Sequence, residues 1–197
     1  MKNRFKNAKI GETVIFGNYY GPAEWLVLDE KEGKIFLLSR YLLERRQFRE
    51  KFGRTSWEES SLRKWLNVPF YEKVFSEEEK ELIAKTKINT PPNGIYGTSG
   101  GNDTEDKIFL LSIEEAKKYF SSDESRAATH KENAGEYGIP DEYCGKNGLW
   151  WLRTMGIDCK RAAVVGAPGY IYEIGSYIDM DYVSVRPAMW VKISENE

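Results

Sequence analysis

The sequence has little of what most catalytic and metal sites require, because it holds one histidine and two cysteines among 197 residues. A zinc or iron site draws on several histidine or cysteine ligands, and a Ser-His-Asp arrangement cannot be argued from His130 alone. We interpret His130 as a solvent-facing side chain on a polar helix, with general acid-base catalysis as the alternative. The sequence therefore predicts no catalytic residue.

The two cysteines, Cys144 and Cys159, are too few for the disulfide framework of a small secreted domain. We predict that both are free thiols. A disulfide between them is the alternative.

Neither sign of charge is in excess, since 29 lysines and arginines face 31 acidic residues without a long block of either. A nucleic-acid-binding domain usually carries a basic patch, so we predict no nucleic-acid partner. No apolar run approaches the ~18 residues of a membrane span. The basic residues near the N-terminus precede no signal-peptide core. We expect a soluble, cytoplasmic protein, or an extracellular one if a leader has been removed.

Aromatic residues are plentiful at 14%, with twelve tyrosines, and such side chains suit both cores and recognition surfaces. Residues 148–153 and 185–190 combine tryptophans with Arg153 and Arg186. We expect these segments to be the closing strands of the sheet. We interpret both arginines, together with Arg63, as groups that bridge backbone carbonyls or pair with buried carboxylates. An anion-binding cleft is the alternative.

Short β-branched and aromatic runs bounded by glycine or proline predict strands. Three of them open the chain as an antiparallel meander. The predicted strands are 12–16, 25–28, 35–38, 85–89, 149–153, 161–165, 170–174 and 183–192, the last interrupted at Pro187.

Helical spacing separates these groups of strands. Trp57, Ser61 and Trp65 share one stripe of a helix, which we expect Asn67 and Pro69 to end. Helices starting after residues 76 and 112 are predicted from two Ser-x-x-Glu capping boxes. A further short helix is predicted around 126–137.

Residues 107–112 repeat residues 34–39 as Lys-Ile-Phe-Leu-Leu-Ser. The surrounding sequence shows no similarity, so we predict two equivalent strands rather than a duplicated domain. The stretch 91–106 is rich in glycine, proline and asparagine and predicts a surface loop.

The order of strands, helices, strands, helix and strands predicts an α+β protein with helices outside a mostly antiparallel sheet. No linker divides the chain. We predict an N-terminal extension over 1–9, a single domain over 10–194 and a C-terminal tail over 195–197.

Many spaced motifs resemble a bacterial domain family of unknown function that is grouped with the C-type lectin-like folds. They are Gly11-Glu12, Val14, Phe16-Gly17, Glu24-Trp25, Val27-Leu28, Leu37-Leu38-Ser39, Ser56-Trp57, Leu62-Arg63, Trp65-Leu66-Asn67, Phe70-Tyr71, Phe75-Ser76, residues 106–112, Trp150-Trp151-Leu152-Arg153 and Val185-Arg186-Pro187-Ala188. The resemblance implies a C-type lectin-like fold, distantly similar to the formylglycine-generating oxidases and to phage receptor-binding domains. A fold of this kind does not fix a function.

Tyrosines with short polar neighbours make adaptable binding surfaces, and they gather after Trp151. We predict a non-catalytic module that binds a protein or a carbohydrate ligand there. The predicted ligand-binding residues are Asp158, Arg161, Tyr170, Tyr172, Tyr177, Asp179, Asp181 and Tyr182. One alternative is a cysteine-dependent oxidoreductase, although neither cysteine lies in a recognisable motif of the formylglycine-generating oxidases. Another is a structural module of a larger assembly.

Two acidic stretches offer the oxygen ligands that calcium prefers. They are residues 102–106, with Asn102, Asp103, Glu105 and Asp106, and the pair Asp179 and Asp181. We interpret both as solvated turns and predict no metal and no cofactor, with a bound calcium ion as the alternative.

Overall fold

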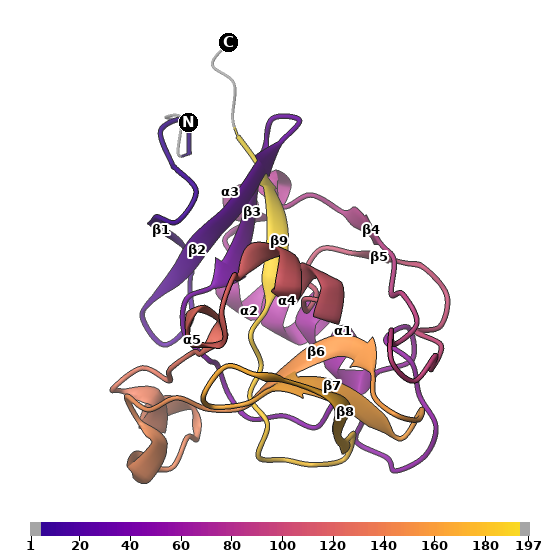
Figure 1. Cartoon of the computed structure of the whole chain (residues 1–197). Helices are drawn as coiled ribbons and strands as arrows, with labels where there is room; N and C mark the ends of the chain where they lie inside the picture. The colour runs from indigo at the N-terminus through magenta and orange to yellow at the C-terminus, as the bar shows by residue number, and fades with distance from the viewer. Residues whose placement is uncertain (1–4, 194–197) are drawn as a thin grey trace.

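The computed structural model describes residues 5–193, which form three antiparallel sheets joined by short helices (Figure 1). This arrangement confirms the predicted α+β class. The predicted tail at 195–197 and the first four residues of the predicted extension lie outside the described residues. Within 5–193, no helix is long and apolar enough to cross a membrane.

The first sheet contains the predicted opening meander. Strands β1 (Thr13–Asn18), β2 (Pro22–Lys31) and β3 (Lys34–Ser39) pair in sequence, and β9 (Ala188–Lys192) adds to β3. The β2-β3 turn uses Glu32 and Gly33, both at positive φ, as a two-residue hairpin requires.

A second sheet of three strands follows later in the chain. It consists of β6 (Trp150–Met155), β7 (Arg161–Val165) and β8 (Ile171–Tyr177), with β7 in the centre. The two tryptophan- and arginine-bearing segments therefore close different sheets, since β6 belongs here and β9 to the first sheet. The expectation that they close one sheet was wrong.

The repeated hexapeptide adopts two different structures. Residues 34–39 form β3, whereas residues 107–112 make only a single bridge, between Phe109 and Ala188 of β9. Side chains satisfy much of the rest of this backbone: Asn67 bonds both Ile108 N and Ile108 O, and Arg153 Nη1 donates to Leu110 O. The prediction of two equivalent strands was wrong because these side chains replace a neighbouring strand.

The predicted helix around Trp65 is shorter at its start and does not end where expected. Trp57 lies in a turn before α1 (Ser61–Trp65), and a π-helical turn η1 (Leu66–Phe70) carries the chain through Pro69 into α2 (Tyr71–Val74). The Asn67 amide donates to Arg63 O at 3.0 Å. A wide π turn tolerates a residue without an N–H because the i→i+4 bonding is already interrupted.

Both capping boxes are confirmed. They begin α3 (Glu77–Leu82) and α4 (Ile113–Tyr119). Between these helices, β4 (Thr86–Ile88) confirms the predicted strand at 85–89 and pairs with β5 (Thr104–Asp106), so the predicted loop 91–106 ends in a strand.

The helix predicted at 126–137 is wrong. The chain forms α5 (Asp123–Arg126) and two 3-10 turns, η2 (Ala134–Tyr137) and η3 (Asp141–Tyr143). Residues between α5 and η2 are extended, because Thr129 O accepts from Leu42 N at 2.8 Å and His130 N donates to Lys146 O at 3.0 Å.

One cluster of buried side chains runs through these elements. It includes Phe16 and Trp25 from the first sheet, Trp57, and Trp150 and Trp151 from β6, all at 1% exposure or less. The functional side chains must therefore be sought at the edges of this core.

Candidate functional site

The half-buried Arg63 and the buried Asp106 form an ion pair that joins α1 to β5. Their Nε and Oδ1 atoms lie 2.6 Å apart, and the other carboxylate oxygen accepts from Trp57 Nε1 at 2.9 Å and Thr104 Oγ1 at 2.7 Å. Asp106 is 1% exposed, so its interpretation as part of a solvated turn was wrong. Arg63 binds a buried carboxylate, as the sequence predicted.

Arg153 and Arg186 also bind groups inside the protein. Arg153 donates to Leu110 O at 2.7 Å and to Asn89 O at 2.8 Å, and it forms an ion pair with Glu115. Arg186 donates to Ser39 O at 3.0 Å and to Arg126 O at 3.1 Å. Burial lowers the pKa of Arg186 to about 9, so it stays charged at neutral pH. The structural interpretation of these arginines is confirmed.

His130 is 1% exposed and lies on an extended segment, so its interpretation as a solvent-facing helical side chain was wrong. Its Nε2 atom lies 2.8 Å from Ser184 Oγ, and Nδ1 lies 3.3 Å from Lys146 O. A serine hydroxyl within hydrogen-bond distance of an imidazole nitrogen is also the arrangement of a nucleophilic serine and its general base. Ser184 is itself 1% exposed, however, so a substrate has no access to the hydroxyl.

Both cysteines are free thiols, as predicted. They have different neighbours: Cys144 Sγ lies 3.9 Å from Pro140 O, whereas Cys159 Sγ lies 3.7 Å from Arg54 Nη2. Among residues 5–193, no three histidine, cysteine or acidic side chains gather as a metal ion would require. In the first acidic stretch, Asp103 pairs with Lys87, and Glu105 with Lys85.

Three of the predicted tyrosines lie on or beside β8. Tyr170 and Tyr172 stand at its start with ring centroids 4.4 Å apart, and each is about two-fifths exposed at 39% and 38%. Ile174 is 48% exposed and shares a face with Tyr172, because alternate residues of a strand point the same way.

A groove runs along this face of the β7-β8 pair, with a volume of about 260 Å³. Its walls are almost entirely apolar. The lining residues are Leu149, Val164, Gly166, Ala167, Pro168, Tyr172, Ile174, Gly175 and Ser176. The Tyr172 ring lies against Gly166, where a Cβ atom would come within 2.7 Å of the ring, so glycine allows the ring to lie over this turn.

The other end of β8 carries a second group of predicted residues. Arg161 donates to Asp158 Oδ2 at 2.7 Å and to Tyr177 OH at 2.6 Å, and its guanidinium lies 4.2 Å from the Tyr177 ring centroid. Phe52, which is 59% exposed, packs against Tyr177 at 6.5 Å between centroids. Since Arg161 pairs with Tyr177 and Val165 with Ile171, the two groups lie at opposite ends of one strand.

The remaining predicted residues follow β8. Tyr182 is 45% exposed and Asp181 is exposed. Asp179 accepts from Gln47 through its backbone oxygen at 2.7 Å, and its Oδ1 atom is buried without a hydrogen-bond partner among residues 5–193. Among residues 5–193, no side-chain hydrogen bond, ion pair or ring contact joins Asp179, Asp181 or Tyr182 to the groove residues.

The sequence analysis did not single out several exposed apolar residues near β8. Ile174 and Ile157 are exposed, and the Ile157 amide donates to Ile174 O at 3.0 Å. Ile95 and Tyr96 are also exposed, on a loop that Asn93 holds against Glu173 O at 3.0 Å. The alternation Tyr172, Ile174 was a usable signal. The loop at 93–96 had none, because only the fold brings it to β8.

The comparisons with known proteins give one family. The model of a family described as a domain of unknown function (DUF6273) matches residues 32–193. No curated protein and no solved structure matches the chain.

Proposed function

The chain belongs to the DUF6273 family of domains of unknown function, and we propose that it is a non-catalytic module that binds a partner protein through the surface along β8. We call this surface the β8 face. It comprises the groove and the exposed side chains Tyr170, Tyr172 and Ile174, with Ile157, whose amide donates to Ile174 O. The observation that carries the proposal is this gathering of exposed apolar side chains around one hollowed strand, since such patches mark interaction sites.

The chemistry of the groove favours a protein over a carbohydrate. The only polar side-chain groups among its lining residues are the Tyr172 and Ser176 hydroxyls. A carbohydrate presents hydroxyl groups that need hydrogen-bond partners, and leaving them unpaired is costly. A protruding apolar side chain of a partner fits such a groove. Tyr172 in the lining and Tyr170 beside it are of a residue type that is enriched among the residues that dominate the affinity of protein interfaces.

We further propose that the domain is C-type lectin-like. The support is the sequence resemblance together with the antiparallel sheets and peripheral helices. In this proposal the β8 face takes the place of a ligand-binding loop region, and the ligand is held without a metal ion.

Photocrosslinking tests the proposed function. The full chain, with Tyr172 replaced by a photoreactive phenylalanine analogue, is irradiated in cells of its source. Tyr143, which is 40% exposed against 38% for Tyr172, is the matched control. We expect one defined protein to crosslink from position 172 and not from position 143, and to bind the purified chain.

Adducts that are the same from both positions would overturn the proposal. So would the absence of any protein adduct from position 172. Binding of the chain to immobilised glycans that Tyr172→Ser abolishes would instead assign the β8 face to a carbohydrate.

A further inference from the structure

A cleft separate from the β8 face opens beside β2, between Tyr41 and the segment 129–133. It has two parts. The outer basin has a volume of about 410 Å³ and is lined by Glu24, Tyr41, Thr129, His130, Lys131, Glu132, Asn133 and Gly145. The inner slot has a volume of about 20 Å³, room for about one water molecule, and is lined by Tyr19, Ala23, Glu24, Trp25, Ser39, Tyr41, Leu43, Phe70, Lys131 and Tyr137.

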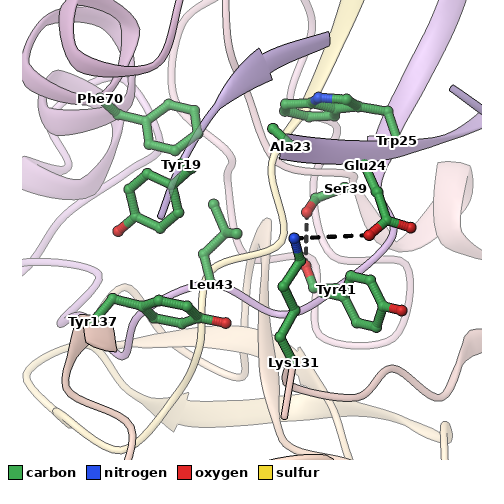
Figure 2. A pocket seen from close by; sticks show the side chains of 10 residues that line it. All are labelled: Tyr19, Ala23, Glu24, Trp25, Ser39, Tyr41, Leu43, Phe70, Lys131 and Tyr137. Atoms are coloured by element: carbon green, nitrogen blue, oxygen red, sulfur yellow. Dashed lines mark hydrogen bonds and ion pairs between the residues drawn. The ribbon is translucent and has the colours of Figure 1, made fainter. Parts of the chain in front are cut away.

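Glu24, Tyr41 and Lys131 belong to both parts and mark the passage between them. Figure 2 shows the Lys131 ammonium pointing toward the Glu24 carboxylate, beside Tyr41, with the rings of Tyr19 and Tyr137 on the far side of Leu43. The Lys131 ammonium donates to Pro22 O at 2.9 Å and lies 3.7 Å from a Glu24 oxygen. The basin is therefore the part with room for a small molecule, and the slot is its closed apolar end.

Several polar side chains of the basin are free to bind a ligand. Among residues 5–193, the side chains of Tyr41, Thr129, Glu132 and Asn133 make no hydrogen bond. Glu24 has only two loose ion pairs, with Lys131 at 3.7 Å and Arg40 at 3.8 Å. Polar groups that converge on a hollow without partners are typical of small-molecule sites.

The charges of the lining favour a cation. Glu24 is already paired with Lys131 and Arg40, whereas Glu132 has no ion-pair partner among residues 5–193. The pKa of His130 is lowered by burial, so the imidazole adds no positive charge at neutral pH. The unpaired Glu132 carboxylate attracts a cation and repels an anion at short range.

The ring of Tyr41 supports the same conclusion. Two cations already lie near its ring centroid, Lys131 Nζ at 5.4 Å and Arg40 Cζ at 5.5 Å. An aromatic face attracts cations within about 6 Å. Lys131 thus shows, within the chain itself, that an ammonium group is accommodated beside this ring and the Glu24 carboxylate.

We propose that the basin binds a small molecule carrying a protonated primary amine. The ammonium lies between Glu24, Glu132 and the Tyr41 ring, and the apolar part of the ligand points toward the slot. Asn133 and Thr129 supply neutral hydrogen bonds at the edge.

A set of three matched probes tests the charge requirement. Benzylamine, benzyl alcohol and benzoate differ mainly in the charge of one group, and each is titrated into the full chain and followed by NMR. We expect benzylamine to bind about tenfold more tightly than the alcohol, the size of a desolvated cation-π contact with a carboxylate partner. Benzoate should bind more weakly still.

Variants connect that preference to the basin. Glu24→Gln and Glu132→Gln keep the shape of the side chain and should each remove most of the preference for the amine. Tyr41→Phe should keep it and Tyr41→Leu should reduce it. Glu78→Gln, on an exposed site of α3 outside the cleft, is the matched control and should change nothing.

Equal affinity for the amine and the alcohol would overturn the proposal, as would tighter binding of benzoate. No binding of benzylamine at millimolar concentration, or binding that Glu24→Gln and Glu132→Gln leave unchanged, would also overturn it. None of these outcomes depends on the β8 face, because the two sites share no lining residue.

Discussion

β6 and β8 are the two outer strands of the same three-stranded sheet, and they differ in what covers them. Every residue of β6 is buried, whereas every residue of β8 is half-buried or exposed. The outer side of β6 is closed by backbone bonds from Trp151 N to Ser184 O at 3.1 Å and from Arg153 N to Leu111 O at 2.9 Å. On the outer edge of β8, the Asn93 side-chain amide donates to Glu173 O.

The difference shows that aromatic residues and arginines have different roles in the two parts of this chain. Both strands and their neighbours combine the two residue types, Trp151 with Arg153 and Tyr177 with Arg161. In β6 these side chains pack in the core or donate to buried backbone carbonyls, because other segments cover the strand. Around β8 the same residue types remain in contact with solvent, where they are available to a partner.

The largest effect is expected in β6. Trp151→Ala should lower the free energy of unfolding by ~3–5 kcal/mol, because it removes a fully buried ring from the core. Its indole N–H also donates to Arg46 O at 2.7 Å. Equilibrium denaturation measures the loss. A change below ~1 kcal/mol would mean that β6 is not part of the core.

The arginines sharpen the comparison. Arg153→Met should cost ~2–3 kcal/mol, because it leaves Leu110 O and Asn89 O without a donor and Glu115 without its cation. Glu115 retains 29% exposure and regains water, which keeps the cost below that of a fully buried pair. Arg161→Met, beside β8, is the control and should cost less than ~1 kcal/mol. Equal costs measured by denaturation would remove the distinction between the two regions.

The covered side of β6 should also be sensitive to acid. His130 contacts Ser184, whose backbone pairs with Trp151. Burial lowers the pKa of His130 below its usual value of 6.5, so the unfolded chain binds the proton more readily than the folded chain. Above the unfolded pKa, the neutral His130 costs the folded chain no stability. As the pH falls below 6.5 toward the folded pKa, the unfolded chain gains protons first and the free energy of unfolding decreases.

Denaturation at a series of pH values measures this loss, with His130→Gln as the comparison. The wild-type chain should lose stability more steeply than the variant across that window. Parallel curves would show that His130 is not the group responsible.

The sequence predicted most strands, the capped helices and the burial of the tryptophans, because alternation and capping are local signals. It did not predict the fate of residues 107–112, which have the same six letters as β3. Whether such a segment pairs as a strand depends on distant groups, here the side chains of Asn67 and Arg153. The same holds for His130, whose burial follows from the pairing of its segment with Leu42 and Lys146.

The candidate sites divide in the same way. The tyrosines of the β8 face could be chosen from the sequence, because Tyr170 and Tyr172 both fall in the predicted strand 170–174. The sequence could not show that Asp179 and Asp181 lie away from the groove, because this depends on the turn that follows β8. The cleft had no sequence signal, since Glu24, Tyr41 and Lys131 come from three separate segments that only the fold brings together.

The most direct test of the β8 face combines two measurements on Tyr172→Ser. We predict that its free energy of unfolding changes by less than ~1 kcal/mol, as for most exposed positions. We also predict that its affinity for the crosslinked partner protein, measured by calorimetry, falls by about 30-fold, the effect of losing a central interface residue. Tyr143→Ser should change neither. An unchanged affinity, or a loss of affinity accompanied by destabilisation comparable to Trp151→Ala, would contradict the assignment of β8 as a binding surface.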